Sequence, residues 1–153
     1  MQWLALTPAE VAFLTASEPA SDDLQARLTR KLAATLTARL RLPVEATPIR
    51  LQLDDIAVES PLWQPDARLA GLWLTRRLGG RRVSGTVPFV PPSLFRMLDA
   101  VLAECWLDKP VQVMPAPLAW KIDSSLSQAT LVLQLPHHTT DMTRWARGVI
   151  RHG

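Results

Sequence analysis

A leucine recurs at every fourth position between Ser21 and Pro43, at positions 24, 28, 32, 36 and 40. An α-helix has about 3.6 residues per turn, so each four-residue step moves the leucine stripe by about 40° around the helix. A helix with such a winding stripe must be covered over much of its circumference. Ser21 is a suitable N-cap, and Arg39 and Arg41 are cations placed well for the helix C-terminus, before Pro43 ends the helix. The repeat therefore predicts a long helix over 22–41 that other elements cover.

Thirteen prolines are spread along the 153 residues and predict short elements elsewhere. Alternating residues predict a strand over 43–55, in which Pro48 favours an edge position or a bulge over a central position. A second helix is expected over 93–106, and its apolar stripe consists of Leu94, Met97, Leu98, Val101, Leu102 and Cys105. The pattern further predicts a loop over 59–67, an extended segment over 108–122, a buried strand over 128–136 and a short helix over 139–150.

Two apolar runs flank Gly79-Gly80 in the stretch "RLAGLWLTRRLGGRRVSGTVPFV". Such runs joined by two glycines predict a β-hairpin. The residues expected on its core-facing side are Leu72, Leu74, Val83 and Val87. In this register Arg77 and Arg82 lie directly opposite each other, which is an unfavourable pair of like charges. The tip is therefore expected to be solvated or to meet an acidic partner.

These elements predict an α+β fold with a mixed, mostly antiparallel sheet. The long helix over 22–41 and the helix over 93–106 are expected to pack on that sheet. Residues 1–20 are expected to form an N-terminal arm with a short helix over 7–16, where Thr7, Pro8 and Glu10 form a helix start. Residues 21–153 are expected to form a single domain, which is the N-terminal part of a longer protein or the product of a shorter gene.

Composition restricts the class of protein. The net charge of +3 is small, although arginine supplies fourteen of the seventeen basic residues. A single cysteine, Cys105, excludes an internal disulfide and suits a reducing compartment. The start of the chain lacks the basic region of a signal peptide, and no apolar run reaches the roughly eighteen residues of a membrane span. We therefore expect a cytoplasmic protein without membrane insertion.

The chain offers few candidates for chemistry. The arginine cluster around Gly79-Gly80 lacks the lysine and the strand–loop–helix context of a P-loop. His137, His138 and Asp141 could bind a metal, but adjacent histidines on a strand point to opposite faces. Cys105 lies on an apolar stripe, where a free cysteine usually acts as a small hydrophobe rather than as a nucleophile paired with a histidine.

Asp54 and Asp55 follow a strand, where adjacent acids are usually turn formers rather than a general acid and base. No hydrolase, metalloprotease or dinucleotide-binding fingerprint occurs in the sequence. We therefore expect no enzymatic activity, no cofactor and no metal.

The order of elements resembles the middle domain of the flagellar motor switch protein FliM and the related SctQ family of type III secretion cytoplasmic-ring proteins. The junction Leu40-Arg41-Leu42-Pro43-Val44-Glu45 is similar to the family's helix-to-strand junction "LR-x-Pro-Val-x-Val". Leu78-Gly79-Gly80 matches the family's turn, and Pro92-Ser93-Leu94 matches the opening of its next helix. The resemblance covers roughly residues 6–107.

Three further features bear on which branch of the family the chain resembles. "LTPAEVAFL" is similar to the FliM N-terminal peptide that binds phosphorylated CheY, with matches at Glu10, Val11 and Leu14. The segment 106–113 lacks the Gly-Gly-x-Gly motif with which FliM contacts FliG, which favours the secretion branch. The chain also ends before any of the β-rich SPOA domains of these proteins.

The resemblance implies a non-enzymatic scaffold in a bacterial type III secretion cytoplasmic ring or sorting platform, located in the cytoplasm at the inner-membrane apparatus. The implied partners are other secretion proteins, such as an SPOA-domain protein and ring or stator components, together with self-association. Tryptophan and arginine are enriched at binding hot spots. The contact residues are expected to be exposed side chains at loops and helix ends, namely Trp63, Trp73, Arg76, Arg77, Arg81, Arg82 and Trp145. The alternative is a regulatory protein that binds nucleic acid or a nucleotide through Arg76–Arg82, although no interleaved aromatics accompany that cluster.

Overall fold

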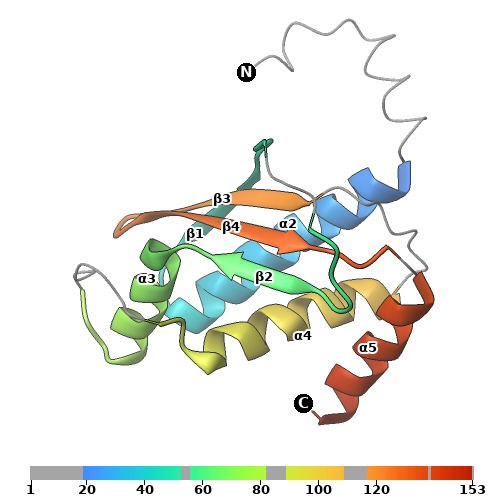
Figure 1. The fold of residues 1–153 in the computed structure, drawn as a ribbon. Helices are drawn as coiled ribbons and strands as arrows, with labels where there is room; N and C mark the ends of the chain where they lie inside the picture. Colours follow the sequence, from blue (N-terminus) through green and yellow to red (C-terminus); the bar gives the residue numbers. More distant parts are fainter. Residues whose placement is uncertain (1–18, 53–55, 82–88, 109–116, 138, 153) are drawn as a thin grey trace, which may run out of the picture.

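The computed structural model of the chain describes residues 19–52, 56–81, 89–108, 117–137 and 139–152. The fold is α+β, as the sequence predicted (Figure 1). Its elements in chain order are α2 (Pro19–Leu40), β1 (Val44–Pro48), β2 (Leu62–Pro65), α3 (Ala67–Arg77), α4 (Pro92–Asp108), β3 (Leu118–Ser124), β4 (Gln128–Gln134) and α5 (Thr139–His152).

The four strands form one sheet in the order β1-β3-β4-β2, and all three strand pairs are antiparallel. β3 and β4 are joined by a tight turn, in which the Ser124 N–H donates to the Ser127 carbonyl over 3.0 Å. β1 and β2 are the two edges, and each ends in a proline, Pro48 or Pro65. The edge position predicted from Pro48 is confirmed.

The core lies between the sheet and two helices, α2 and α4, which cover the same face of the sheet (Figure 1). All five leucines of the repeat are at most 2% exposed, so the predicted cover of the long helix is confirmed. The apolar stripe predicted for α4 is buried as well. Trp120 of β3 is fully buried, and its indole N–H donates to the Thr29 hydroxyl of α2 over 2.8 Å. This bond fixes the helix against the middle of the sheet.

Residues 67–77 form helix α3, so the prediction of a hairpin strand there is wrong. Asp66 caps the helix: its Oδ1 accepts from the Leu69 N–H over 2.9 Å. Leu69, Leu72 and Trp73 are buried at helical spacing, whereas Leu74 is 39% exposed. Leu72 and Leu74 therefore do not share the core-facing side that a strand would give them. The local cap and the helical spacing outweigh the alternating pattern.

Gly79 and Gly80 end helix α3 rather than turning a hairpin. The Gly79 N–H donates to the Arg76 carbonyl over 3.1 Å, and the Gly80 N–H donates to the Thr75 carbonyl over 2.8 Å. These two bonds, with Gly79 at a φ of 78°, are those of a Schellman motif. A Cβ at position 80 would lie 2.8 Å from the Thr75 Cγ2, so the close approach at this position also requires glycine. The expected pairing of Arg77 with Arg82 does not form, since Arg77 is helical.

The structure confirms some of the other predicted elements and changes the bounds or the type of the rest. The strand over 128–136 and the helices over 93–106 and 139–150 are confirmed, and the extended segment 108–122 contains β3. The loop expected over 59–67 contains β2, which pairs with β4 because Trp63 adds to the core. Helix α2 begins at Pro19, two residues before the expected cap at Ser21. The predicted short helix over 7–16, together with Asp54, Asp55, Arg82, Val83 and Val87, lies outside the described residues.

Asp66 joins three elements. Besides capping α3, its Oδ2 accepts from the Thr130 N–H of β4 over 2.9 Å, and its own N–H donates to the Thr130 carbonyl over 3.0 Å. Asp66 therefore extends the pairing of β2 with β4 by one residue and starts the next helix. Because both carboxylate oxygens accept from backbone N–H groups, no uncharged side chain can replace both bonds.

We expect Asp66→Ala to lower the free energy of unfolding by about 1–3 kcal/mol, since it removes a helix cap and a second backbone hydrogen bond. Asp66→Asn should cost less, because the amide oxygen can still cap α3. Urea unfolding of the two variants measures both losses. Equal losses for alanine and asparagine would contradict separate roles for the two carboxylate oxygens.

Asp99 of α4 is half-buried. Burial raises the pKa of its carboxyl above the usual value of 3.8, and the indole N–H of Trp63 offsets part of that rise. A carboxyl whose pKa is raised by folding stabilises the fold while it is protonated, and this contribution is lost as the pH rises through the folded-state pKa. Asp99 therefore lowers the stability of the fold at pH values above the usual carboxyl pKa.

Asp99→Asn should accordingly increase the free energy of unfolding at about pH 7, where the carboxyl of the unfolded wild type is charged. At about pH 3 the wild-type carboxyl is mostly neutral in both states, and the difference should vanish. Urea unfolding at the two pH values tests this expectation. A variant that is less stable than the wild type at about pH 7 would contradict it.

Candidate functional site: an arginine-lined hollow

The C-terminal ends of α2 and α3 meet at a hollow of about 580 Å³. Five arginines from two short segments of the chain line it. The lining residues are Arg39, Leu40, Arg41, Arg76, Arg77, Gly79 and Arg81. We refer to this site as the arginine hollow. Its two walls are the end of α2 at 39–41 and the end of α3 with its cap at 76–81.

Both walls have the same local geometry. α2 ends as α3 does, with the Leu42 N–H donating back to the Thr37 carbonyl over 3.4 Å and with a left-handed residue, Arg41, before it. The Thr37 hydroxyl then holds β1, since it accepts from the Val44 N–H over 3.0 Å. Both helix ends are therefore fixed by their own capping bonds.

Arg76 ties the two walls together. Its guanidinium donates to the Leu40 carbonyl over 2.8 Å, to the Arg41 carbonyl over 3.0 Å and to the Gly80 carbonyl over 3.1 Å. Arg76 was expected to contact a partner, but all three bonds go to the backbone of the chain itself. It therefore positions the hollow rather than offering a free cation.

The other four arginines exceed what the helix ends can neutralise. Each helix C-terminus carries roughly half a negative charge, so the two ends together contribute about −1. Arg76 alone balances that charge. Arg39, Arg41, Arg77 and Arg81 are exposed, no acidic residue lines the hollow, and none of the four forms an ion pair within the described part of the chain. The hollow is thus a concentrated positive site.

Arg41 adds a second sign of specialisation. Its φ of 52° lies in the left-handed region, where a residue with a Cβ costs about 1–2 kcal/mol relative to the right-handed one. Glycine is the usual residue at this position of a Schellman motif, and Gly79 occupies it at the end of α3. At the end of α2 an arginine stands there instead. Strained residues of this kind cluster at functional sites.

The predicted contact residues are distributed over different parts of the structure. Arg77 and Arg81 are exposed in the hollow, whereas Trp63 and Trp73 are only 3% and 2% exposed. The Trp73 indole N–H donates to the Ser93 hydroxyl over 2.9 Å, and the Trp63 ring lies 6.2 Å from that of Trp120. The expectation that these two tryptophans are exposed is wrong, because both fill the core. Arg82 lies outside the described residues.

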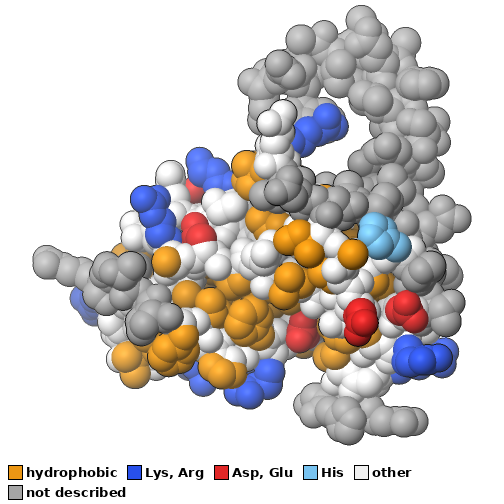
Figure 2. Space-filling model, in the orientation of Figure 1, with side chains coloured by type: hydrophobic (Ala, Val, Ile, Leu, Met, Phe, Trp, Pro, Cys, Tyr) orange, Lys and Arg blue, Asp and Glu red, His pale blue; other side chains and the backbone are white. Residues whose placement is uncertain are grey.

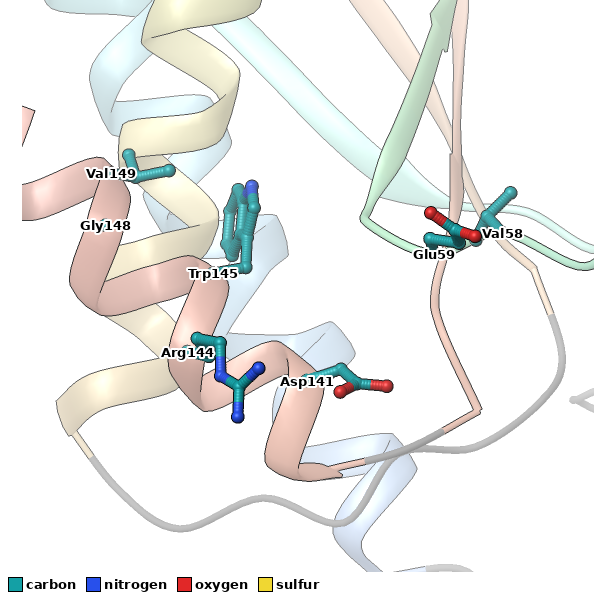
Figure 3. A pocket seen from close by; sticks show the side chains of 7 residues that line it. All are labelled: Val58, Glu59, Asp141, Arg144, Trp145, Gly148 and Val149. Carbon is teal, nitrogen blue, oxygen red and sulfur yellow. The ribbon is translucent and has the colours of Figure 1, made fainter.

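Trp145 is half-buried on α5 and lines a second, larger hollow of about 810 Å³. Figure 3 shows the two sides of this hollow. The side chains of α5 lie on one side, and Val58 and Glu59 lie on the other. Asp141 and Arg144 of α5 also border it. Its charges are of both signs, so it has no chemical preference comparable to that of the arginine hollow.

The remaining candidates are not brought together. His137 and Asp141 are exposed, His138 lies outside the described residues, and Cys105 is 7% exposed within the apolar stripe of α4. In the described ranges, no three His, Cys, Asp or Glu side chains are grouped so that they could hold a metal ion. None of the helices in those ranges is both long and apolar enough to cross a membrane.

Sequence reasoning missed the contribution of Arg39 and Arg41 to the site. The sequence pattern indicated only that they are cations at a helix C-terminus. Their place beside the end of α3 follows from the contact between Arg76 and Leu40, which are 36 positions apart in the chain. The signal was the repetition of one pattern, a leucine helix ending in arginines, at 36–41 and 72–81.

The chain matches no protein-family model, no curated protein and no solved structure. The resemblance to the FliM and SctQ family therefore rests on the sequence pattern.

We expect Arg41→Gly to raise the free energy of unfolding by about 0.5–1 kcal/mol, because glycine adopts the left-handed conformation without strain. The matched control is Arg39→Gly, which places glycine in the regular helix and should cost about the same amount. Thermal and urea unfolding measure both changes. A loss of stability in Arg41→Gly equal to that of the control would contradict the role of strain at Arg41.

Proposed function

We propose that this chain is a non-enzymatic scaffold domain that acts through protein–protein contacts at the arginine hollow. The observation that carries the proposal is the group of four exposed arginines, none of which has an acidic partner in the described part of the chain. Such a group is held in place by Arg76 and by two helix caps, so it is preorganised. An organised positive surface favours a complementary negative one on a partner.

The proposed setting is a cytoplasmic ring or sorting platform of a bacterial type III secretion system. The support comes from the sequence resemblance and from where its residues lie. Two of the segments that resemble the FliM and SctQ family, Leu40–Glu45 and Leu78-Gly79-Gly80, include the capped ends of α2 and α3. Each of these two segments overlaps one wall of the arginine hollow, through Leu40 and Arg41 on one side and Gly79 on the other. Proposed partners are an SPOA-domain protein, ring or stator components, and further copies of the chain.

Nucleic-acid or nucleotide binding is the second candidate, and the same four guanidinium groups favour it. Among the described residues, no aromatic side chain lines the hollow, so they provide no stacking platform of the kind that a single-strand binder uses. Binding to a duplex that weakens steeply with salt would be its signature. The protein-contact function is the better supported of the two.

The test is affinity capture of the tagged full chain from a bacterium that expresses it together with a type III secretion system. The wild type should retain an SPOA-domain protein or a ring or stator component. Arg77→Glu combined with Arg81→Glu should lose that protein, because reversed charges repel an acidic partner. Quantitative mass spectrometry of the captured proteins measures the difference.

The matched control is Arg147→Glu, which reverses an exposed arginine of α5 that lines neither hollow. It should retain the partner at the wild-type level. Capture without any secretion component would refute the proposed setting. Equal capture by the double variant and the wild type would refute the arginine hollow as the contact site.

A further inference from the structure

We infer that the arginine hollow binds an acidic peptide segment of its partner, with carboxylates that bridge the two walls and an apolar side chain that packs on Leu78. The inference rests on the proposed function, since it names the chemistry of the segment that would occupy the same site. It follows from the charge and the walls of the hollow and from the exposed leucine next to it in the chain.

The two walls present cations at a fixed separation. Arg39 and Arg41 extend from the end of α2, while Arg77 and Arg81 extend from the end of α3 and its cap. Two hydrogen bonds of Arg76, to the Leu40 and Arg41 carbonyls, hold these walls together, and its third bond, to the Gly80 carbonyl, lies within the α3 wall. Because arginine forms bidentate bonds with carboxylates, a segment with several carboxylates can bind both walls at once.

The helix ends discriminate between a peptide and a simple anion. Sites that enclose phosphate usually point backbone N–H groups at it from a helix N-terminus. Here two helix C-termini border the hollow, so the backbone N–H groups of such a phosphate site are missing. A site built to enclose free phosphate is therefore not expected at these helix ends.

An exposed leucine stands in the chain next to residues that line the hollow. Leu78, the C-cap of α3, is 79% exposed, the most among the large hydrophobic side chains in the described ranges. It follows Arg77 and precedes the glycines of the cap. Figure 2 shows other hydrophobic side chains gathered across the middle of the viewed face, with Lys and Arg mostly towards its edge. The phosphate backbone of a nucleic acid would leave the Leu78 side chain exposed to water. A peptide with an apolar residue between acidic residues would cover it.

The test measures fluorescence anisotropy of a labelled peptide in which glutamates alternate with leucines, titrated with the full chain. Three further probes are the same peptide with glutamines in place of glutamates, a labelled DNA duplex, and inorganic phosphate as a competitor. The glutamate peptide should bind, the glutamine peptide should not, and raising the salt from about 50 to 200 mM should weaken binding. Phosphate at the same concentration as an unlabelled glutamate peptide should compete less well than that peptide.

Three variants locate the site. Arg77→Gln with Arg81→Gln should weaken peptide binding about tenfold or more, since several charge-assisted bonds are lost. Arg41→Gly should weaken binding without loss of stability, which separates a lost contact from a damaged fold. Arg76→Lys keeps the charge but cannot make all three backbone bonds, so it should weaken peptide binding while leaving the salt dependence unchanged. Arg147→Gln is the control and should bind as the wild type does.

The inference is overturned if the glutamate peptide does not bind, if the double glutamine variant binds it equally well, or if the duplex binds more tightly and the same variant abolishes that binding. Failure of the proposed function is distinguishable from these results. If the reversed-charge variant loses secretion components in the capture experiment while the glutamate peptide fails to bind, the hollow contacts a partner of different chemistry. If the peptide binds at the hollow but no secretion component is captured, the inference of an acidic peptide ligand is supported and the proposed setting in a type III secretion system is refuted.

Discussion

The burial of the α2 leucine stripe is the constraint on which the rest of the structure depends. Five leucines at four-residue spacing wind around the helix, so no single flat surface can cover them all. The structure meets this requirement with two surfaces, the sheet on one side and α4 on the other. Once both are in place, the capped end of α2 has a fixed position. The location of the arginine hollow is therefore a consequence of how the leucines are covered.

Sequence patterns predicted the elements whose signals are long or unambiguous, namely α2, α4, β4, α5 and the α+β class. They failed between 59 and 81, where two periods compete. Alternate leucines at 72 and 74 suggested a strand, while Asp66, the spacing of Leu69, Leu72 and Trp73, and the Gly-Gly pair all indicated a helix with a cap at each end. Two glycines suit a hairpin turn and a Schellman motif equally well, so only the flanking caps could decide.

The candidate site could be predicted only in part for a related reason. The local cluster at 76–82 was visible in the sequence, but the contribution of Arg39 and Arg41 depends on a contact between distant segments that no local pattern encodes. The tryptophans were misjudged because a composition rule for interfaces cannot separate an exposed ring from a core ring. Trp63 and Trp73 are both buried in the core, and the Trp73 indole N–H donates to the Ser93 hydroxyl within the fold.

The prolines at the sheet edges restrict how this fold can join with others. Pro43 and Pro48 bracket β1, and Pro61 and Pro65 bracket β2, so each edge is short and lacks backbone donors at both ends. Such an edge is a poor template for an added strand. Pairing of the sheet edge-to-edge with a strand of another molecule is therefore disfavoured at both β1 and β2. Contacts through side chains and helix ends are the ones that this fold leaves open to a second molecule.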